Sequence, residues 1–274
     1  AMNTNMFHNA IVQDNIEELK RFDIEIVEPE TGLLACNAVG SGRLPSEEVL
    51  LEYILKAIHL DKDLEGKRVL VTAGATQEAI DPVRYITNHS TGKMGYAIAR
   101  IAMHRGADVT LVSGPASIAP PMCVRVVNVV SAADMFEAVK ELAPESDIII
   151  KAAAVADYTP VEHHSEKITK SAGGTVLELE RTQDILSYLG RNRKEGQVIC
   201  GFSMETENLI ENSKRKLQEK NVDLIVANNL KVEGAGFGGD TNVVTLIMKD
   251  RIEELPCMTK EQVAQAILDV IVKK

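Results

Sequence analysis

The chain has 274 residues, of which 45% are hydrophobic and 26% are charged, and its formal net charge is -10. This composition is typical of a soluble globular protein, and the acidic balance argues against a general nucleic-acid binder, which would carry a basic face. No apolar run approaches the roughly 18–20 residues that cross a membrane, so we expect no membrane partner.

Residues 1–60 differ in character from the rest. The spacing of apolar residues predicts a helix over 9–22, a short strand over 24–27 and a loop over 31–45. Ser46 is a suitable N-cap for an amphipathic helix that runs to about Ile58. One strand is too little to bury a core, so we interpret residues 1–60 as the end of a longer domain.

A charged stretch over 61–67 predicts a linker, and residues 61–274 form the second predicted domain. Continuous apolar runs indicate strands that are buried on both faces, as in a parallel sheet. The alternation of strands and helices predicts an α/β fold: a doubly wound, Rossmann-like, mostly parallel sheet with a C-terminal hairpin and long active-site loops. The expected strands are 69–72, 109–112, 124–129, 147–153, 198–202, 224–227, 243–248 and 252–255, and the expected helices are 92–105, 132–142, 183–193, 208–220 and one from about 260.

Two long polar stretches, 158–175 and 231–241, interrupt the alternation. Each follows the carboxyl end of an expected strand, which is the edge where open α/β sheets bind ligands. The first stretch carries Lys167 and Lys170, and the second carries four glycines. Long loops inside compact domains are usually functional or disordered, so we expect both to border the active site.

The stretch 72–94 joins an expected strand to the start of an expected helix. Asn88, Ser90, Thr91, Gly92 and Lys93 supply an amide, two hydroxyls, a close backbone approach and a cation at this helix start. Unpaired N–H groups and the positive end of the helix dipole make such a start a site for phosphate or carboxylate oxygens. An ordinary N-cap remains an alternative.

Two standard nucleotide motifs do not fit this stretch. A P-loop fails because Met94 follows Gly92 and Lys93, and Thr87 stands where the first glycine belongs. A dinucleotide site fits weakly, because the first turn contains only Gly74 as glycine and no acidic residue ends the second strand. An NAD(P)-dependent reductase therefore remains an alternative, and so does a non-enzymatic domain that senses nucleotides.

The remaining interpretation is a nucleotide or phosphorylated substrate held by small polar residues and neutralised by lysines. Lys216 and Lys220 are four residues apart and share one helix face, although each lysine alone is more typical of a solvated surface. Small residues at Ala152 and Ala153 let a flat ring lie against backbone, and Asp157 is placed to accept from a base or sugar. A turn or N-cap role for Asp157 is equally open.

Cysteine usage gives the expected location. Cys36, Cys123, Cys200 and Cys257 stand far apart, so neither a zinc site nor a disulfide framework is indicated and no metal ligands are predicted. Unpaired cysteines favour a reducing compartment, and the start lacks the charged-then-apolar order of a signal peptide. We expect a cytoplasmic protein.

Five motifs stand in order along the second domain: TAG at 72–74, DPVRYI at 81–86, NHSTGKMG at 88–95, AAVADY at 153–158 and EKI at 166–168. With these motifs the chain resembles the phosphopantothenate–cysteine ligase family from about residue 67 to the end. The resemblance implies that 4'-phosphopantothenate is joined to L-cysteine through an acyl-cytidylate, with release of CMP and pyrophosphate. It also implies CTP as the nucleotide in bacterial members and ATP in animal relatives, Mg²⁺ that arrives with the triphosphate, and a homodimer formed through the ligase domain.

The same resemblance implies roles for individual residues. Asn88 would hold the phosphopantothenate carboxylate and the acyl intermediate, and Lys167 would act on the triphosphate or the acyl-phosphate. Asp157 and the backbone at Ala152 and Ala153 would bind the cytidine. The expected nucleotide-binding residues are Gly74, Ser90, Thr91, Gly92, Ala152, Ala153, Asp157, Lys167, Phe202, Lys216 and Lys220.

A second resemblance lies in residues 1–60. The motif MNTNMF at 2–7 and Cys36 are similar to the flavin-dependent phosphopantothenoylcysteine decarboxylase, in which Asn and Cys at these places bind substrate and donate a proton. Phe7 replaces a Trp of that family, and Asn37-Ala38 replaces a Gly followed by an acid. We therefore expect a decarboxylase remnant in a ligase-active chain, with Cys36 as its catalytic residue and FMN bound only in a longer parent protein.

Overall fold

A computed structural model describes residues 1–169, 176–205, 208–229 and 238–274. The described chain divides into two compact units, Ala1–Leu60 and Asp61–Lys274. The predicted loops 158–175 and 231–241, and with them Lys170, lie partly outside the described residues. None of the described helices combines the length and the apolar character that crossing a bilayer requires.

The first unit consists of short elements, and the sequence predicted only some of them. Helices at 9–22 and from Ser46 are confirmed, and the Ser46 side chain accepts from Val49 N as an N-cap. The strand expected over 24–27 and the loop expected over 31–45 are wrong, because the strands of this unit are β1 and β2, which pair as a hairpin. The elements are α1(Thr4–Phe7), α2(Ala10–Arg21), β1(Glu30–Leu33), β2(Val39–Arg43) and α3(Glu47–Ile58).

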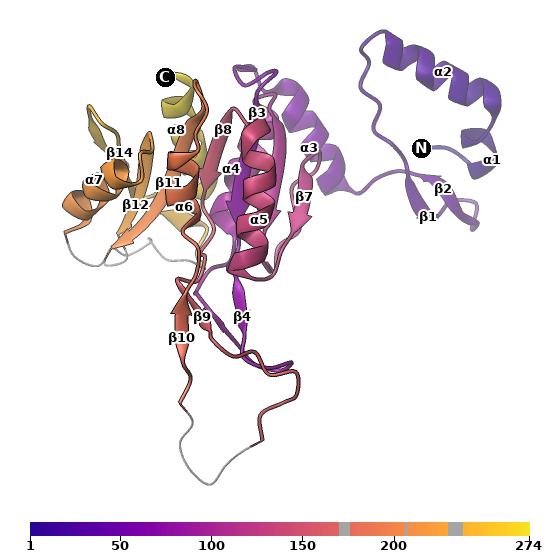
Figure 1. The fold of residues 1–274 in the computed structure, drawn as a ribbon. Helices are drawn as coiled ribbons and strands as arrows, with labels where there is room; N and C mark the ends of the chain where they lie inside the picture. Colours follow the sequence, from indigo (N-terminus) through magenta and orange to yellow (C-terminus); the bar gives the residue numbers. More distant parts are fainter. Residues whose placement is uncertain (170–175, 206–207, 230–237) are drawn as a thin grey trace. The chain divides into compact units, whose positions relative to one another are not determined.

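The second unit has the predicted doubly wound architecture (Figure 1). Its main sheet has the order β15-β14-β12-β11-β8-β3-β6-β7, in which the strands from β12 to β7 run parallel and β14 and β15 form the expected antiparallel hairpin. The main-sheet strands are β3(Arg68–Ala73), β6(Asp108–Ser113), β7(Arg125–Asn128), β8(Ile148–Lys151), β11(Val198–Glu205), β12(Leu224–Asn229), β14(Val244–Ile247) and β15(Ile252–Glu254).

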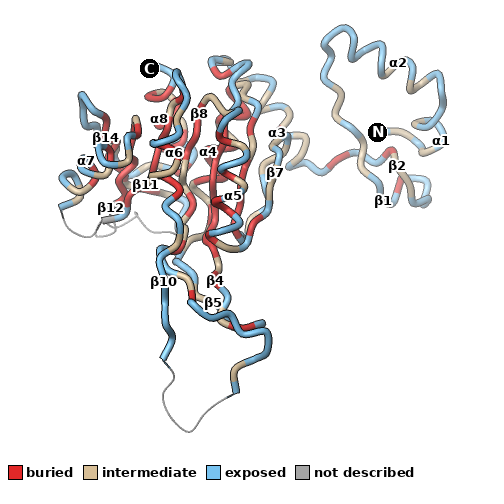
Figure 2. The backbone as a smooth tube through the Cα atoms, in the orientation of Figure 1, coloured by how far each residue is buried: buried red, intermediate tan, exposed pale blue. Residues whose placement is uncertain are grey.

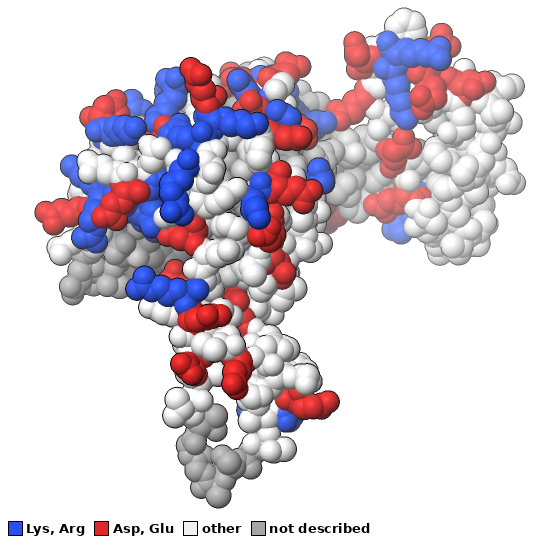
Figure 3. All heavy atoms as spheres, viewed as in Figure 1, with Lys and Arg blue, Asp and Glu red and all other residues white. Residues whose placement is uncertain are grey.

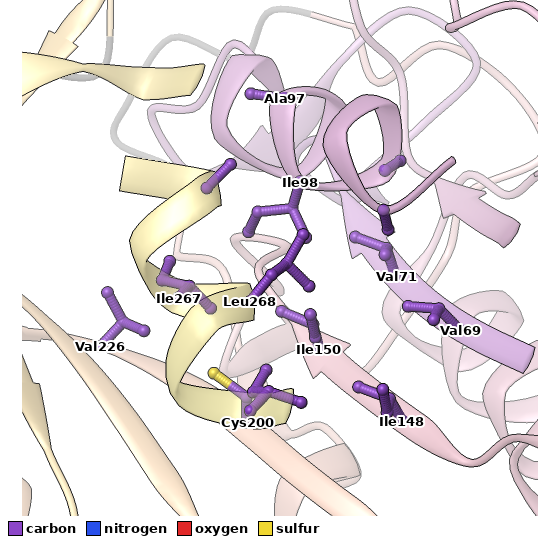
Figure 4. Close-up of a cluster of buried hydrophobic side chains, with 14 of the residues drawn as sticks. Val69, Val71, Ala97, Ile98, Ile148, Ile150, Cys200, Val226, Ile267 and Leu268 are labelled. Atoms are coloured by element: carbon purple, nitrogen blue, oxygen red, sulfur yellow. The ribbon is translucent and has the colours of Figure 1, made fainter. Parts of the chain in front are cut away.

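Helices cover both faces of this sheet because each central strand alternates its apolar side chains between them. Ile148 and Ile150 face α4 and α8, whereas Ile149 faces α5, α6 and α7. Figure 4 shows the first of these cores, with Ile98, Ile267 and Leu268 packed on the strands, and Figure 2 shows the buried strands between the helices. The helices are α4(Lys93–His104), α5(Ala132–Leu142), η1(Ala143–Glu145), α6(Ile185–Arg191), α7(Leu209–Glu219) and α8(Lys260–Val272).

Short strand pairs at the carboxyl edge of the sheet were not predicted. Two of them, with residues 161–169, form an extension that we call the arm and that projects from the main sheet (Figure 1). His164 N donates to Ile80 O at 3.1 Å, which connects the two halves of the arm. The pairs are β4(Gln77–Ala79) with β5(Tyr85–Thr87), β9(Tyr158–Pro160) with β10(Leu179–Arg181), and, away from the arm, β13(Thr241–Asn242) with β16(Met258–Thr259).

Candidate active site

The candidate site lies where the strand order reverses. The chain passes from β3 to β6 on one side and later returns to β8 on the other, so the carboxyl ends of β3 and β8 border a crevice. Gly74 follows β3 with φ 77°, and its carbonyl accepts from Ala154 N at 2.9 Å. The predicted Gly74 and Ala152–Ala153 segments therefore meet at this switch point.

The start of α4 has the features of an anion site. Gly92 is the N-cap with φ 77°, and no side chain caps the helix, so the first N–H groups are available to a ligand. A Cβ on Gly92 would lie 3.3 Å from Gly74 N, which shows how closely the two glycine turns approach. The predicted helix start is confirmed, and Ser90, Thr91 and Lys93 surround it.

A small pocket of about 50 Å³, which we call the α4 pocket, opens at this helix start. Lys93 donates to Asp240 Oδ1 at 2.6 Å, and this hydrogen bond lowers the pKa of Asp240. Lys260 is 7% exposed, and its burial lowers its pKa. Asn228 Oδ1 is buried with no hydrogen-bond partner in the described structure. The lining residues are Ser90, Thr91, Gly92, Lys93, Met94, Gly95, Ala152, Ala154, Phe202, Met204, Asn228, Asn242 and Lys260.

A second pocket of about 440 Å³, the large pocket, lies on the α6 and α7 side of the same edge. Lys220 Nζ lies 2.7 Å from Asp184 Oδ2 and 2.8 Å from Ser187 Oγ. Lys216 donates to Phe202 O at 3.2 Å. The lining residues are Lys151, Val155, Ala156, Asp157, Tyr158, Arg181, Thr182, Gln183, Asp184, Ile185, Leu186, Phe202, Lys216 and Lys220.

One segment separates the two pockets. Over residues 151–157 the chain contributes Ala152 and Ala154 to the α4 pocket and Lys151, Val155, Ala156 and Asp157 to the large pocket. Phe202 lines both. The two pockets are therefore neighbours at the carboxyl edge of the sheet, and an elongated ligand can occupy both.

Most of the predicted nucleotide-binding residues are brought together by this arrangement. Ser90, Thr91, Gly92 and Ala152 line the α4 pocket, while Asp157, Lys216 and Lys220 line the large pocket. Ala153 is buried behind them, where its N–H donates to Thr72 Oγ1 at 3.2 Å. Gln183 and Asp184 were missed, although they are the first two residues of the predicted helix 183–193, and this helix start was a usable signal.

Lys151 was also missed, because the sequence IIIK reads as one buried strand. Its Nζ lies in the wall of the large pocket and donates to Ala153 O at 3.3 Å. Burial, together with the charge of Lys216, lowers the pKa of Lys151 to about 8. Asp157 and Asp184 act in the opposite direction on this pKa.

Asn88 lies beside the wall between the pockets. Its side chain is exposed, and Nδ2 donates to Val155 O at 3.0 Å. Val155 belongs to the separating segment, so the Asn88 amide sits at the junction of the two pockets rather than in the lining of either.

Lys167 lies in neither pocket lining but on the exposed arm. The arm is fixed there by the buried carboxylate of Asp81, which accepts from Ile168 N at 3.2 Å and from Arg84 Nε at 2.8 Å. Arg84 Nη2 in turn donates to Ile168 O at 2.9 Å. These bonds, led by that of Arg84, hold the pKa of Asp81 well below its usual range. Through these hydrogen bonds the DPVR motif at 81–84 fixes the position of Ile168, which is the residue next to Lys167.

The first unit brings its two motifs together. Asn3 Nδ2 lies 3.6 Å from Cys36 Sγ, and Met2 N donates to Gly42 O at 2.8 Å. Cys36 is exposed and unpaired. The motif residues at 2–7 and Cys36 therefore share one local site within residues 1–60.

Comparisons with known proteins identify the family. Residues 64–274 match the DNA/pantothenate metabolism flavoprotein C-terminal domain, and residues 1–59 match the flavoprotein family. The coenzyme A biosynthesis bifunctional protein CoaBC of Bacillus subtilis is 48% identical over 99% of this chain and 68% of that protein.

Two solved structures of this family are similar to this chain in sequence and in fold. The crystal structure of a C-terminal domain of CoaBC is 47% identical, with a TM-score of 0.67 over 78% of this chain and 97% of that one. The DNA/pantothenate metabolism flavoprotein from Streptococcus pneumoniae is 26% identical, with a TM-score of 0.67 over 75% of this chain and 98% of that one. The chain belongs to the CoaBC family of coenzyme A biosynthesis, and its DNA/pantothenate metabolism domain is a phosphopantothenate–cysteine ligase.

Proposed function

We propose that the ligase uses CTP and forms an acyl-cytidylate at the junction of the two pockets. The observation that supports this most directly is the pair of neighbouring pockets that share Phe202. The α4 pocket offers a helix start, two hydroxyls and two lysines, which suit phosphate oxygens. The large pocket offers the volume and the mixed donors and acceptors that suit a nucleoside.

The reaction then needs little covalent participation by the protein. A carboxylate oxygen of 4'-phosphopantothenate attacks the α-phosphorus of CTP, the bond to the β-phosphate oxygen breaks, and pyrophosphate leaves. The cysteine amine next attacks the acyl carbon, the bond to CMP breaks, and the amine loses a proton. Catalysis is therefore mostly positioning and electrostatic stabilisation. We assign the donor at the reacting carboxylate and acyl group to Asn88, because its amide lies beside the junction.

We also propose that Lys167 acts on the phosphates of a second chain in a homodimer formed through the ligase domain. Support comes from its position on the arm, which projects from the sheet, outside the pocket linings of its own chain. A cyclic dimer would then hold two composite sites, each with Asn88 from one chain and Lys167 from the other.

Mixing two inactive variants tests this arrangement. Lys167→Gln and Asn88→Asp chains are unfolded and refolded together, and pyrophosphate release is measured against each variant alone. If Lys167 acts across the dimer, half of the dimers are mixed and each holds one intact site, so about a quarter of wild-type activity returns. Action within one chain would leave the mixture as inactive as its components.

Nucleotide preference is tested by pyrophosphate release with CTP and with ATP, in the presence of phosphopantothenate and with or without cysteine. We expect CTP to support release, and cysteine to convert the intermediate to 4'-phosphopantothenoylcysteine and CMP. Binding of CTP without pyrophosphate release would favour the nucleotide-sensing alternative instead. A shift in NAD(P)H fluorescence would favour the reductase alternative.

The proposed function also involves a metal ion, and the proposed parent protein involves a flavin. The described residues contain no group of three or more His, Cys, Asp or Glu side chains that could hold a metal ion. We propose that Mg²⁺ enters with the triphosphate, and we assign no protein ligands to it. FMN would belong to the decarboxylase part of a longer parent, and Asn3 and Cys36 would contribute its substrate side.

We propose the following domain assignment: residues 1–60 are the end of the decarboxylase domain plus linker, and residues 61–274 are the ligase domain. The separate match of 1–59 to the flavoprotein family supports it.

A cytoplasmic location is supported by the unpaired state of all four cysteines. Side chains of both signs are interspersed over the face shown in Figure 3, which favours small-molecule partners over nucleic acid.

A further inference from the structure

Lys151 lines the large pocket, and its ammonium group uses only one of its three N–H donors for a hydrogen bond among the described residues. It extends from the end of β8 and makes one hydrogen bond, to Ala153 O at 3.3 Å, among the described residues. None of the described carboxylates forms an ion pair with it, although Asp157 and Asp184 line the same pocket. A lysine carries three N–H donors, so two remain for a ligand.

The other cations of this wall are placed differently. Lys220 is held by Asp184 and Ser187, and Lys216 donates to Phe202 O. Arg181 is exposed to water. A partly buried cation with unused donors loses solvation until a ligand supplies an acceptor, so the site favours ligands that offer one.

The ligand group that meets Lys151 follows from the proposed function, on which this inference rests. If the phosphates lie at the start of α4, the nucleoside fills the large pocket, and the acceptor near Lys151 belongs to the base or sugar. Cytosine carries a ring carbonyl oxygen, whereas adenine has none. We propose that Lys151 donates a hydrogen bond to the carbonyl oxygen of a pyrimidine base and thereby selects CTP over ATP.

Removal of the Lys151 donor should change the preference for CTP over ATP more than it changes the rate of the chemical step. A hydrogen bond that involves a charged group contributes on the order of a 10- to 100-fold change in binding, and a site built around a donor discriminates against ligands without the matching acceptor. Lys151→Met should therefore lower kcat/KM for CTP by roughly 10- to 100-fold and leave that for ATP nearly unchanged.

The experiment measures pyrophosphate release with CTP and with ATP for the full chain and for three variants. Lys151→Met removes the donor, and Lys151→Gln keeps a neutral donor and should retain part of the preference. Lys140→Met is the matched control, because Lys140 is exposed on α5 and ion-paired to Glu137 at 2.9 Å. Thermal unfolding of each variant shows whether it is folded.

The outcomes separate the two proposals. If the wild-type chain releases no pyrophosphate with CTP, the proposed function fails. If the wild type is active and Lys151→Met keeps its CTP-to-ATP ratio, the assignment of Lys151 is overturned while the function stands. Equal losses with both nucleotides would place Lys151 on the ribose or phosphates and would also overturn it. A reduced ratio in the Met variant, with an unchanged ratio in the Lys140 control, supports it.

Discussion

We predict that the protonation of Lys151 makes nucleotide binding sensitive to alkaline pH. Burial and the nearby charge of Lys216 lower the pKa of Lys151 to about 8 in the free chain, whereas an acceptor on the nucleotide favours the ammonium and raises this pKa on binding. Well below pH 8 the lysine is charged in both states, so affinity is constant. Above pH 8 binding must take up a proton, so affinity falls.

The size of the effect follows from the fraction of chains that are charged. With a pKa of about 8, roughly three quarters of the chains carry the ammonium at pH 7.5 and roughly one tenth at pH 9, so the Kd for CTP should rise about eightfold. Phosphate groups, with a second pKa near 6, are fully ionised throughout this range. Calorimetric titration with CTP at constant ionic strength measures the change.

The Lys151→Met variant isolates this group from the others that face it, which are Asp157, Asp184, Lys216 and the more distant Lys220 and Arg181. Its Kd should be weaker and should not vary over the same pH range. A flat wild-type profile, or an equal slope in the variant, would refute the reasoning.

The same variant should be more stable than the wild type at neutral pH. The unfolded chain holds the lysine proton up to its ordinary pKa of 10.5, whereas the folded chain loses it near 8. The unfolded state therefore binds more protons between these values, so wild-type stability is reduced below pH 8 and recovers as pH rises towards 10.5. The deficit at pH 7 is on the order of 2–3 kcal/mol, and thermal unfolding at pH 7 and pH 10 should show the variant's advantage shrinking.

Three further predictions concern the remaining site residues. Lys167→Gln should leave thermal unfolding unchanged and reduce turnover on the order of 10²–10³-fold, the usual loss for one charge-stabilising donor; near-normal turnover would remove it from the mechanism. Asn88→Asp should slow formation of the acyl intermediate, because it places an anion beside an anion; unchanged single-turnover rates would contradict this. Gly74→Ala should lower the unfolding temperature, because φ is 77° and the new Cβ would lie 2.7 Å from Gly114 O; unchanged unfolding would show that the turn relaxes.

Local patterns predicted the parallel sheet well. Continuous apolar runs such as the three isoleucines at 148–150 require cover on both faces, and that requirement alone implies helices on both sides. Helix starts were also predictable, because Ser46 and Gly92 carry their own signals for the N-cap and the turn. These features depend on residues that are near one another in the sequence.

Features that depend on distant partners were not predictable. The strands β1 and β2 contain Gly32, Gly40 and Gly42, whose weak strand propensity hides a hairpin that pairing stabilises. Asp81 and Ile168 meet across 87 residues, and Lys220 and Asp184 across 36. The periodicity of apolar residues along the sequence does not predict contacts between residues so far apart. The position of Lys151 in the large pocket was not predicted for a related reason, because a strand pattern does not show which face of the sheet borders a pocket.

Under the proposed function, the two pockets explain how a chain with a net charge of -10 would bind a triphosphate. Lysines gather at one sheet edge, and two of them are each held there by a carboxylate: Lys93 by Asp240 and Lys220 by Asp184. Each pair compensates the cation in the free chain. An acceptor on the incoming nucleotide, a phosphate oxygen at Lys93 or a nucleoside oxygen at Lys220, competes with the carboxylate for the cation. Affinity for the nucleotide is then the difference between two charge-assisted interactions rather than the full strength of one. None of the carboxylates in the described part of the chain is ion-paired with Lys151, so an acceptor that reaches Lys151 contributes its hydrogen bond without that competition.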